Sequence, residues 1–182
     1  MKKKPKIKNG WVSGDKFCRM ARPGIWKLSV LWFFSIFYCS IEIVCVVTGR
    51  GWSYSNHTRR CYKHFSELKS WTAARAYCQA QAPHTGDLAS VPDQDTNLFL
   101  SSLTSETVWI GGYQKDARDG AWGWSDGTAW GFESWCPGEP NNFGGYAEDY
   151  LATNFCSPGG WNDFTVSVNS TFNSGFICQY EN

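Results

Sequence analysis

The chain has 182 residues, which leaves room for one folded domain and additional segments. It contains 11 Trp, 12 Phe and 8 Tyr, so a small, loop-rich domain can still build a core. The formal net charge is +1, but residues 1–27 hold nine basic residues against Asp15, a net of +8 (9 − 1). An apolar stretch follows directly, which favours a topology signal over nucleic-acid binding, and we expect no nucleic-acid partner.

The apolar stretch covers residues 28–47 and is interrupted only by Glu42. As a helix it would be about 30 Å long, enough to cross a bilayer core, and the preceding positive charge would keep its N-terminal side in the cytosol. Two interpretations remain open. One is a type II signal-anchor of a single-pass membrane protein. The other is a cleaved signal peptide, with a long basic segment or a start at Met20, ending near Val47 or Gly49. Both place the C-terminal domain outside the cell, secreted or membrane-bound.

Cysteine and glycosylation signals agree with an extracellular compartment. Five of the eight cysteines follow the apolar stretch, and oxidising compartments favour disulfides in small domains. Asn56 and Asn169 each begin an Asn-X-Ser/Thr acceptor sequence for N-glycosylation. The five cysteines are Cys61, Cys78, Cys136, Cys156 and Cys178.

Two helices are predicted after a polar stretch at residues 48–58, which we interpret as a short stalk, and a strand from near Trp52 past Cys61. Ser70 can cap a helix over residues 71–81. Its inner stripe comprises Trp71, Ala74, Tyr77 and Cys78. Asp93 can cap a second helix through Leu103. The side chains expected to pack this helix are Leu98, Phe99 and Leu103.

Short strands and one long loop are predicted for the remainder. The stretch from Phe132 to Gly145 has no periodic pattern, and loops of that length in a compact domain are usually functional or disordered. The fold class is therefore α+β, with two helices, short antiparallel sheets and a long loop. The predicted strands cover residues 108–112, 122–124, 150–155 and 175–180.

Oxygen-bearing side chains gather in and after this loop, in the strings Glu139-Pro140-Asn141, Glu148-Asp149 and Trp161-Asn162-Asp163. Calcium prefers six to eight oxygen ligands at about 2.3–2.6 Å. A single Glu-Pro-Asn string would more often be solvated loop residues, but the conjunction of the strings favours a calcium site. The expected ligands are Glu139, Asn141, Glu148, Asn162 and Asp163.

From about Gly51 onward the chain resembles a C-type lectin domain, because several motifs occur in that family's order. They are Cys61-Tyr62, Trp71 with Ala74 and Cys78, Leu88-Ala89-Ser90-Val91, Trp109-Ile110-Gly111-Gly112, Trp122-Gly123-Trp124-Ser125-Asp126-Gly127, Gly138-Glu139-Pro140-Asn141-Asn142, Glu148-Asp149, Trp161-Asn162-Asp163 and Phe176-Ile177-Cys178. The resemblance implies a lectin domain at residues 59–182 with the long calcium-binding loop of this fold.

The resemblance also implies the mode of binding. In the family, the proline of Glu-Pro-Asn follows a cis peptide bond, and two neighbouring sugar hydroxyls complete the calcium shell. The pairs Glu139/Asn141 and Glu148/Asn162 would each supply an acceptor and a donor to those hydroxyls. Together with Asp163, these four residues form the carbohydrate site, which therefore comprises all five calcium ligands. Glu-Pro-Asn accompanies mannose-type ligands: mannose, N-acetylglucosamine and fucose.

Further features of the site remain open. A second calcium is left unassigned, because Gln114 stands where an acid is expected; its candidates are Asp119, Asn142 and Asp149. Phe143 and Tyr146 either contact sugar or pack the loop. Trp109, Trp122, Trp124 and Trp161 are interpreted as core residues.

Disulfides follow partly from the resemblance. The family's core bridge corresponds to Cys78–Cys178. Its second bridge has no cysteines at the matching positions, Tyr150 and about Val166, so we propose that Cys136 and Cys156 pair across the loop. Cys61 has three open fates: a bridge to Cys45, a disulfide-linked dimer, or a free thiol.

The function expected from these observations is calcium-dependent binding of glycans or glycoproteins with mannose-type preference. The alternative is a non-carbohydrate protein-interaction module on the same scaffold, such as an immune-type receptor or a venom-like or antifreeze-like variant, because a fold does not determine function. An enzyme is not expected, since the chain lacks GxSxG, HExxH and a histidine paired with a nucleophile.

Overall fold

A computed structural model of the chain describes residues 45, 51–82, 84–116, 120–165 and 172–181. The basic segment 1–27 lies outside these residues, as does the apolar stretch 28–47 apart from Cys45. The two interpretations of the apolar stretch therefore remain predictions. Within the described residues, no helix combines the length and the apolar character needed to cross a bilayer.

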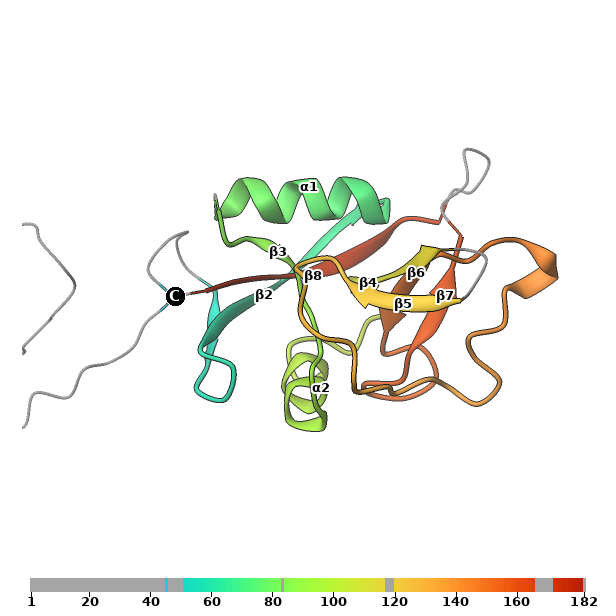
Figure 1. The fold of residues 1–182 in the computed structure, drawn as a ribbon. Coiled ribbons are helices and arrows are strands. Elements are labelled where there is room, and N and C mark those ends of the chain that lie inside the picture. Colours follow the sequence, from blue (N-terminus) through green and yellow to red (C-terminus); the bar gives the residue numbers. More distant parts are fainter. Residues whose placement is uncertain (1–44, 46–50, 83, 117–119, 166–171, 182) are drawn as a thin grey trace, which may run out of the picture. The chain divides into compact units, whose positions relative to one another are not determined.

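The fold is α+β, as predicted, with two helices and a sheet of eight strands among the described residues (Figure 1). The strand order is β1-β2-β8-β4-β6-β7, with β3 paired to β8 and β5 paired to β4. The sheet is mixed rather than wholly antiparallel, since β4 and β8 run parallel at Val108↔Gly175 and Trp109↔Phe176. The elements are β1 (Ser53–Ser55), β2 (Arg60–Lys69), α1 (Trp71–Gln81), β3 (Asp87–Leu88), α2 (Gln94–Ser101), β4 (Val108–Asp116), β5 (Ala121–Trp124), the 3-10 turn η1 (Phe143–Gly145), β6 (Tyr150–Thr153), β7 (Asn162–Phe164) and β8 (Ser174–Glu181).

The first strand predicted from the sequence is in fact a hairpin. A turn at residues 56–59 separates β1 from β2, and the backbone N–H of Arg59 donates to the Ser55 carbonyl over 2.8 Å. Arg59 adopts a left-handed φ of 56°, which reverses the chain. The polar residues of the turn lack the alternation that would sustain one longer strand.

Helix α1 begins and ends where the sequence predicts. The Ser70 hydroxyl accepts the backbone N–H of Ala73 at 3.3 Å, which caps the first turn. Trp71, Ala74 and Cys78 are buried, and the Trp71 indole N–H donates to the Ile110 carbonyl over 2.7 Å. This bond ties the start of the helix to the middle of the sheet.

Helix α2 starts at the predicted cap but ends earlier than Leu103. The Asp93 carboxylate accepts the Thr96 backbone N–H at 2.8 Å. The helix buries Thr96, Asn97 and Leu100, whereas Leu98, predicted to pack it, is 54% exposed. Asn97 determines this orientation because it accepts the Trp161 indole N–H at 3.1 Å and donates to the Gly159 carbonyl at 3.0 Å.

The two helices pack on opposite faces of the sheet. Alternate residues of β4 and β8 enter different core clusters, as expected for strands whose successive side chains point to opposite faces. Trp109 and Phe176 pack with α1, whereas Ile110 and Ile177 pack with Leu100 of α2. The sheet is therefore covered on both sides and gives a rigid base for the loop that leaves it after β5.

A polar network joins β2, β8 and the turn after β5. One carboxylate oxygen of Asp126, Oδ2, accepts hydrogen bonds from Arg60, Ser90, Thr128 and Gln179 over 2.6–3.0 Å. Burial disfavours ionisation of Asp126, but bonds from Thr128 and Ser90 and the charge of Arg60 outweigh it, so the pKa of Asp126 lies below its usual value.

We therefore expect Asp126→Asn to lower the free energy of unfolding by about 2–3 kcal/mol at pH 7, since the buried network loses its negative charge and one of its two acceptor oxygens is replaced by an NH2 donor. A group whose pKa is depressed by folding stabilises above its unfolded pKa, and this contribution disappears as the pH falls through the folded value. The difference in the free energy of unfolding between the wild type and the variant should thus shrink below about pH 4. Urea unfolding of both proteins at pH 7 and pH 3 would measure this change.

Glu181→Gln is the matched control for this prediction. Glu181 contacts the same Arg60 at 3.4 Å, but its side chain is largely exposed, so the change should cost well under about 1 kcal/mol. Equal losses in the two variants would show that the buried network contributes no more than a surface ion pair.

Candidate functional site

The long segment between β5 and β6 is fastened to the sheet at Trp161. The Cys136 N–H donates to the Trp161 carbonyl at 2.9 Å, and the Trp161 N–H donates to the Ser134 carbonyl at 2.8 Å. The Trp161 side chain is fully buried and contacts Trp124, Trp130 and Trp135. Residues 134–136 are thereby aligned beside the residue that precedes Asn162 and Asp163, and Figure 1 shows the loop projecting away from the chain's C-terminus.

Glu139 and Asn141 form a pair on this loop, and the Glu139–Pro140 peptide bond between them is cis. The Asn141 side-chain amide donates to Glu139 Oε1 at 2.9 Å. Glu139 is half-buried and Asn141 is exposed, so this pair presents one acceptor group and one donor group side by side at the surface.

Two buried carboxylates hold the loop in place. Asp163 on β7 is fully buried and accepts the backbone N–H groups of Asn141 at 3.2 Å and Asn142 at 3.1 Å. Glu148 accepts the Phe143 N–H at 2.7 Å, and its own N–H donates to Asn142 Oδ1 at 3.1 Å. Asn142, a candidate ligand of the unassigned second calcium, adopts a left-handed φ of 49° and positions the loop through its bond from the Glu148 N–H.

Two predicted ligand oxygens are buried without a hydrogen-bond donor. They are Glu139 Oε2 and Asn162 Oδ1, and Asp149 Oδ1 shares this property. The Asn162 amide group donates to the Asp163 carbonyl at 2.6 Å, which leaves its oxygen directed elsewhere. Buried polar atoms are almost always paired, so oxygens of this kind indicate a missing electrophilic partner. The donor set, five side chains with hard oxygen atoms, fits calcium.

The three carboxylates influence one another electrostatically. Burial, a carboxyl–carboxylate hydrogen bond to Asp163, and the charges of Asp163 and Glu148 raise the pKa of Glu139. Burial raises the pKa of Glu148, and the Asp163 charge adds to that effect. When all three are ionised, no donor reaches Glu139 Oε2, and the carboxylates repel each other. Within the described ranges, no three His, Cys, Asp or Glu side chains are grouped so that they could hold a metal ion. Glu148 and Asp163 accept backbone N–H groups instead.

The predicted residues thus separate into two layers. Glu139 and Asn141 lie at the surface, whereas Glu148 and Asn162 are only 8% and 7% exposed and Asp163 is fully buried. Beside them, Phe143 and Tyr146 are exposed, while Trp109, Trp122, Trp124 and Trp161 are core residues, as interpreted from the sequence.

Three disulfides are formed among the described residues: Cys45–Cys61, Cys78–Cys178 and Cys136–Cys156. Cys78–Cys178 joins α1 to β8, and Cys136–Cys156 spans the start of the loop. Of the three fates left open for Cys61, the structure shows the bridge to Cys45, so the Cys61 sulfur is not available for a disulfide-linked dimer. Of the two glycosylation candidates, Asn56 is exposed in the β1–β2 turn, whereas Asn169 lies outside the described residues.

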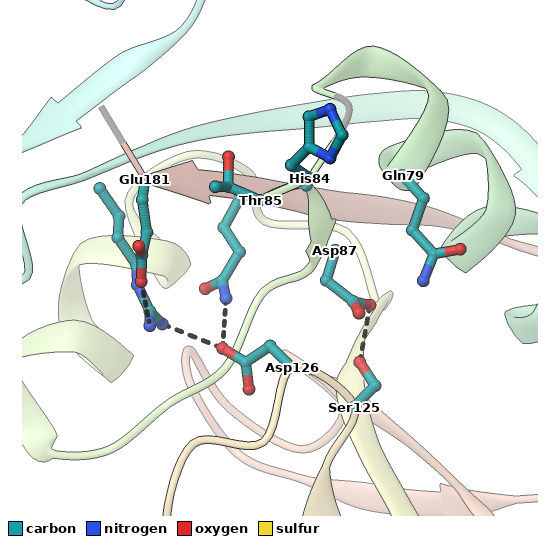
Figure 2. A pocket seen from close by; sticks show the side chains of 10 residues that line it. Gln79, His84, Thr85, Asp87, Ser125, Asp126 and Glu181 are labelled. Atoms are coloured by element: carbon teal, nitrogen blue, oxygen red, sulfur yellow. Dashed lines mark hydrogen bonds and ion pairs between the residues drawn. The ribbon is translucent and has the colours of Figure 1, made fainter.

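A separate hollow of about 440 Å³ lies near the ends of α1 and β8 (Figure 2). Its charged groups are already paired: Arg60 with Asp126, Arg75 with Asp87, and Asp87 with the Ser125 hydroxyl at 2.7 Å. This hollow therefore has few unpaired charged groups with which to bind a ligand. Its lining residues are Arg60, Gln79, His84, Thr85, Gly86, Asp87, Ser125, Asp126, Gln179 and Glu181.

Comparison with known families agrees with this architecture. The family model described as the lectin C-type domain matches residues 67–180. The chain belongs to the C-type lectin domain family. This family is non-enzymatic and binds carbohydrate in general, so the chain is a binding module rather than an enzyme.

Proteins similar to this lectin domain include carbohydrate-binding proteins and a calcium-independent antifreeze protein. A lectin from Pleurodeles waltl is 36% identical over 130 residues, covering 68% of this chain and 72% of that protein. The carbohydrate-recognition domain of cow CD23, solved in the presence of a GlcNAc2Man3 oligosaccharide, has a TM-score of 0.62 at 26% identity, covering 76% and 98%. A calcium-independent type II antifreeze protein has a TM-score of 0.63 at 27% identity, covering 76% and 95%.

Loss of the loop disulfide should be measurable. Replacing Cys136 and Cys156 with Ala removes a bridge that closes a loop with a sequence separation of 20 residues. This change should lower the free energy of unfolding by about 3 kcal/mol. Because Phe143 and Tyr146 are exposed on that loop, chymotrypsin should also cleave there faster than in the wild type. The control removes Cys45–Cys61, whose separation is 16 residues; faster loop cleavage there as well would contradict a local clamping role.

Proposed function

We propose that this lectin domain binds carbohydrate through a calcium ion held by Glu139, Asn141, Glu148, Asn162 and Asp163. The observation that carries the proposal is the pair of buried, donor-free oxygens on Glu139 and Asn162, which sit among carboxylates that repel one another. A cation at this place would both pair those oxygens and relieve the repulsion. The family match supports carbohydrate as the ligand class.

A bound calcium ion supplies open coordination positions that vicinal sugar hydroxyls can fill. The residues of this chain orient those hydroxyls: a carboxylate accepts from a hydroxyl and a carboxamide donates to it. Glu139 and Asn141 are already adjacent at the surface for this task. Glu148 and Asn162 now bond to the Phe143 N–H and the Asp163 carbonyl, so their role toward sugar requires them to exchange these partners.

We infer a mannose-type preference from the resemblance to the family, in which a Glu-Pro-Asn string such as Glu139-Pro140-Asn141 accompanies mannose-type ligands. Exchanging the two residue types reverses which side of the site accepts and which donates, and so changes the hydroxyl geometry that fits. The GlcNAc2Man3 present with the cow CD23 domain is an example of a mannose-containing ligand beside the same fold. Glycans or glycoproteins are therefore the proposed partners.

An extracellular setting is proposed on the strength of the three disulfides, because such bridges persist in oxidising compartments. The choice between a secreted protein and a type II membrane anchor depends on residues 28–47, and no membrane partner is assigned to the domain itself. Exposure of Asn56 in its turn is compatible with the proposed glycosylation there.

A calcium-independent binding module is the second candidate, favoured by the likeness to the calcium-independent antifreeze protein. A type-2 ice-structuring protein from Brachyopsis segaliensis, 33% identical over 97 residues, is a second relative named for ice structuring rather than for carbohydrate. In that case Glu148 and Asp163 would serve only to hold the loop amides, as they do in the structure. The two candidates differ in whether calcium changes the protein.

Calcium should stabilise the wild-type protein by about 2.7 kcal/mol when present at a hundredfold excess over its dissociation constant, because only the folded state assembles the site. Glu139→Gln should lose most of this gain, and without calcium it should be no less stable than wild type, since one repelling charge is gone. Thermal unfolding with calcium and with a chelator measures both.

Glu133→Gln serves as the control, because Glu133 is an exposed acid of the same loop and is not one of the proposed calcium ligands. Its carboxylate accepts a hydrogen bond from the Trp130 indole. It should keep the full calcium response. An identical melting temperature of the wild type with and without calcium would favour the calcium-independent module.

The protein should bind mannose-agarose in calcium and elute with a chelator. Combining Glu139→Gln with Asn141→Asp should move retention from mannose to galactose, because the acceptor and donor exchange places while both groups still offer oxygen to calcium. Calorimetric titration should show calcium affinity within about threefold of wild type, or roughly 0.7 kcal/mol. Retention by galactose alone in the wild type would contradict the mannose assignment.

A further inference from the structure

The three disulfides differ in how far solvent can reach them. Cys78 and Cys178 are fully buried, and so is Cys61 in the bridge nearest the N-terminus. In the loop bridge, Cys136 is 5% exposed, whereas Cys156 is the only exposed cysteine among the described residues. A thiol reduces a disulfide by direct attack on one sulfur, so access to a sulfur controls the rate. The loop bridge is therefore the one most open to reduction.

This bridge packs against the backbone of Gly160. An added Cβ at that position would lie 2.7 Å from Cys156 Sγ and 3.0 Å from Cys136 Sγ. Gly160 directly precedes Trp161, whose backbone groups bond the outgoing loop. The bridge therefore lies beside the hydrogen bonds that hold the base of the loop.

The segment closed by the bridge carries three of the five proposed calcium ligands, Glu139, Asn141 and Glu148. The other two, Asn162 and Asp163, follow the bridge on β7. Closing a loop reduces the conformational freedom of the residues within it. The bridge thus restricts the side chains that an ion has to bring together.

Hydrogen bonds provide the other restraint on this segment, and a bound ion competes with them. Asp163 accepts the N–H groups of Asn141 and Asn142 at 3.2 and 3.1 Å, and Glu148 accepts the Phe143 N–H at 2.7 Å. Both carboxylates are also proposed calcium ligands, so the ion and the loop amides share the same oxygens. The disulfide does not take part in this competition, and it restrains the loop whether or not the ion is bound.

We propose that the Cys136–Cys156 bridge is a redox switch on the calcium site. Its reduction by a thiol releases the loop and weakens calcium binding, while the other two bridges keep the domain folded. The inference rests on the proposed function, because calcium is the ligand whose binding the switch controls. By thermodynamic linkage, calcium then favours the closed bridge by the same factor by which the bridge favours calcium.

The reduction consists of two thiol–disulfide exchanges. One thiolate of a dithiol attacks Cys156 Sγ and forms a mixed disulfide, and Cys136 leaves as a thiolate that takes up a proton. The second thiol of the reductant attacks its own sulfur in the mixed disulfide, which releases Cys156 and closes the reductant into a disulfide. In net terms, two electrons and two protons pass from the dithiol to the bridge.

The first experiment follows all three bridges of the full chain in dithiothreitol. Free thiols are blocked beforehand, and each newly formed thiol is trapped by alkylation and identified by peptide mass spectrometry. Cys136 and Cys156 should be labelled first, because Cys156 is exposed. Earlier labelling of Cys45 and Cys61, or labelling of all bridges together, would overturn the switch.

The second experiment measures the linkage. The double variant with Cys136→Ser and Cys156→Ser should bind calcium about tenfold more weakly than the wild type, which lies within the usual range of coupling between sites. In a glutathione redox buffer, calcium should raise the equilibrium constant for closing the loop bridge by the same factor. For this two-electron couple, tenfold corresponds to about 30 mV. The near-UV circular dichroism of the tryptophan core should stay unchanged in the variant.

Cys45–Cys61 is the internal control, because its cysteines lie outside the loop and calcium should leave its closing equilibrium unchanged. Equal calcium affinity of the wild type and the double variant would overturn the switch and leave the proposed function intact. Loss of the near-UV signal in the variant would assign the bridge to global folding instead. Absence of calcium binding by the wild type would remove the proposed function together with the switch, whatever the order of reduction.

Discussion

The buried carboxylate of Asp163 is the interaction on which the candidate site depends. It lies on β7 at the inner end of the loop, fully removed from solvent, and accepts two successive loop amides. Burying a carboxylate is costly unless donors surround it. The loop supplies those donors, so its backbone is held at Asn141 and Asn142 while the side chain of Asn141 remains free to face outward. The Asp163 carboxylate therefore both fixes the position of the loop and belongs to the set of predicted ligands.

The aromatic core makes this interaction possible. Trp161 immediately precedes Asn162, and its indole is enclosed by other tryptophans and hydrogen-bonded to Asn97 of α2. Its backbone groups bond residues 134 and 136 of the outgoing loop. The start of the loop and the strand that carries Asp163 are thus held by one residue, and the Cys136–Cys156 bridge adds a covalent link nearby. A large loop can be ordered in this way without a hydrophobic core of its own.

The scaffold leaves the chemistry of the site to a few side chains, as is general for widely used folds. This lectin domain resembles both a carbohydrate-recognition domain and a calcium-independent antifreeze protein at nearly equal identity. In this chain the site contains buried oxygens that lack donors, and two exposed aromatic residues lie beside them. The donor-free oxygens of Glu139 and Asn162 are the observation on which the proposed calcium site rests.

The amino-acid sequence by itself determined the features that local chemistry controls. Ser70 and Asp93 cap the two helices because a short polar side chain can accept a backbone N–H two or three residues ahead. The residue types of Glu139, Asn141 and Asp163 also predict oxygen ligation of a cation, and this stays a prediction. The fold class followed from ordered motifs and periodicity.

Only the tertiary structure decided the features that join distant segments. It paired Cys61 with Cys45, directed Leu98 into solvent because Asn97 bonds Trp161, and made β4 and β8 parallel. It also turned Glu148 toward the Phe143 amide and left an oxygen of Asn162 buried and unpaired. These outcomes depend on which groups meet across the fold and compete for one donor, and neither spacing nor residue type encodes that competition.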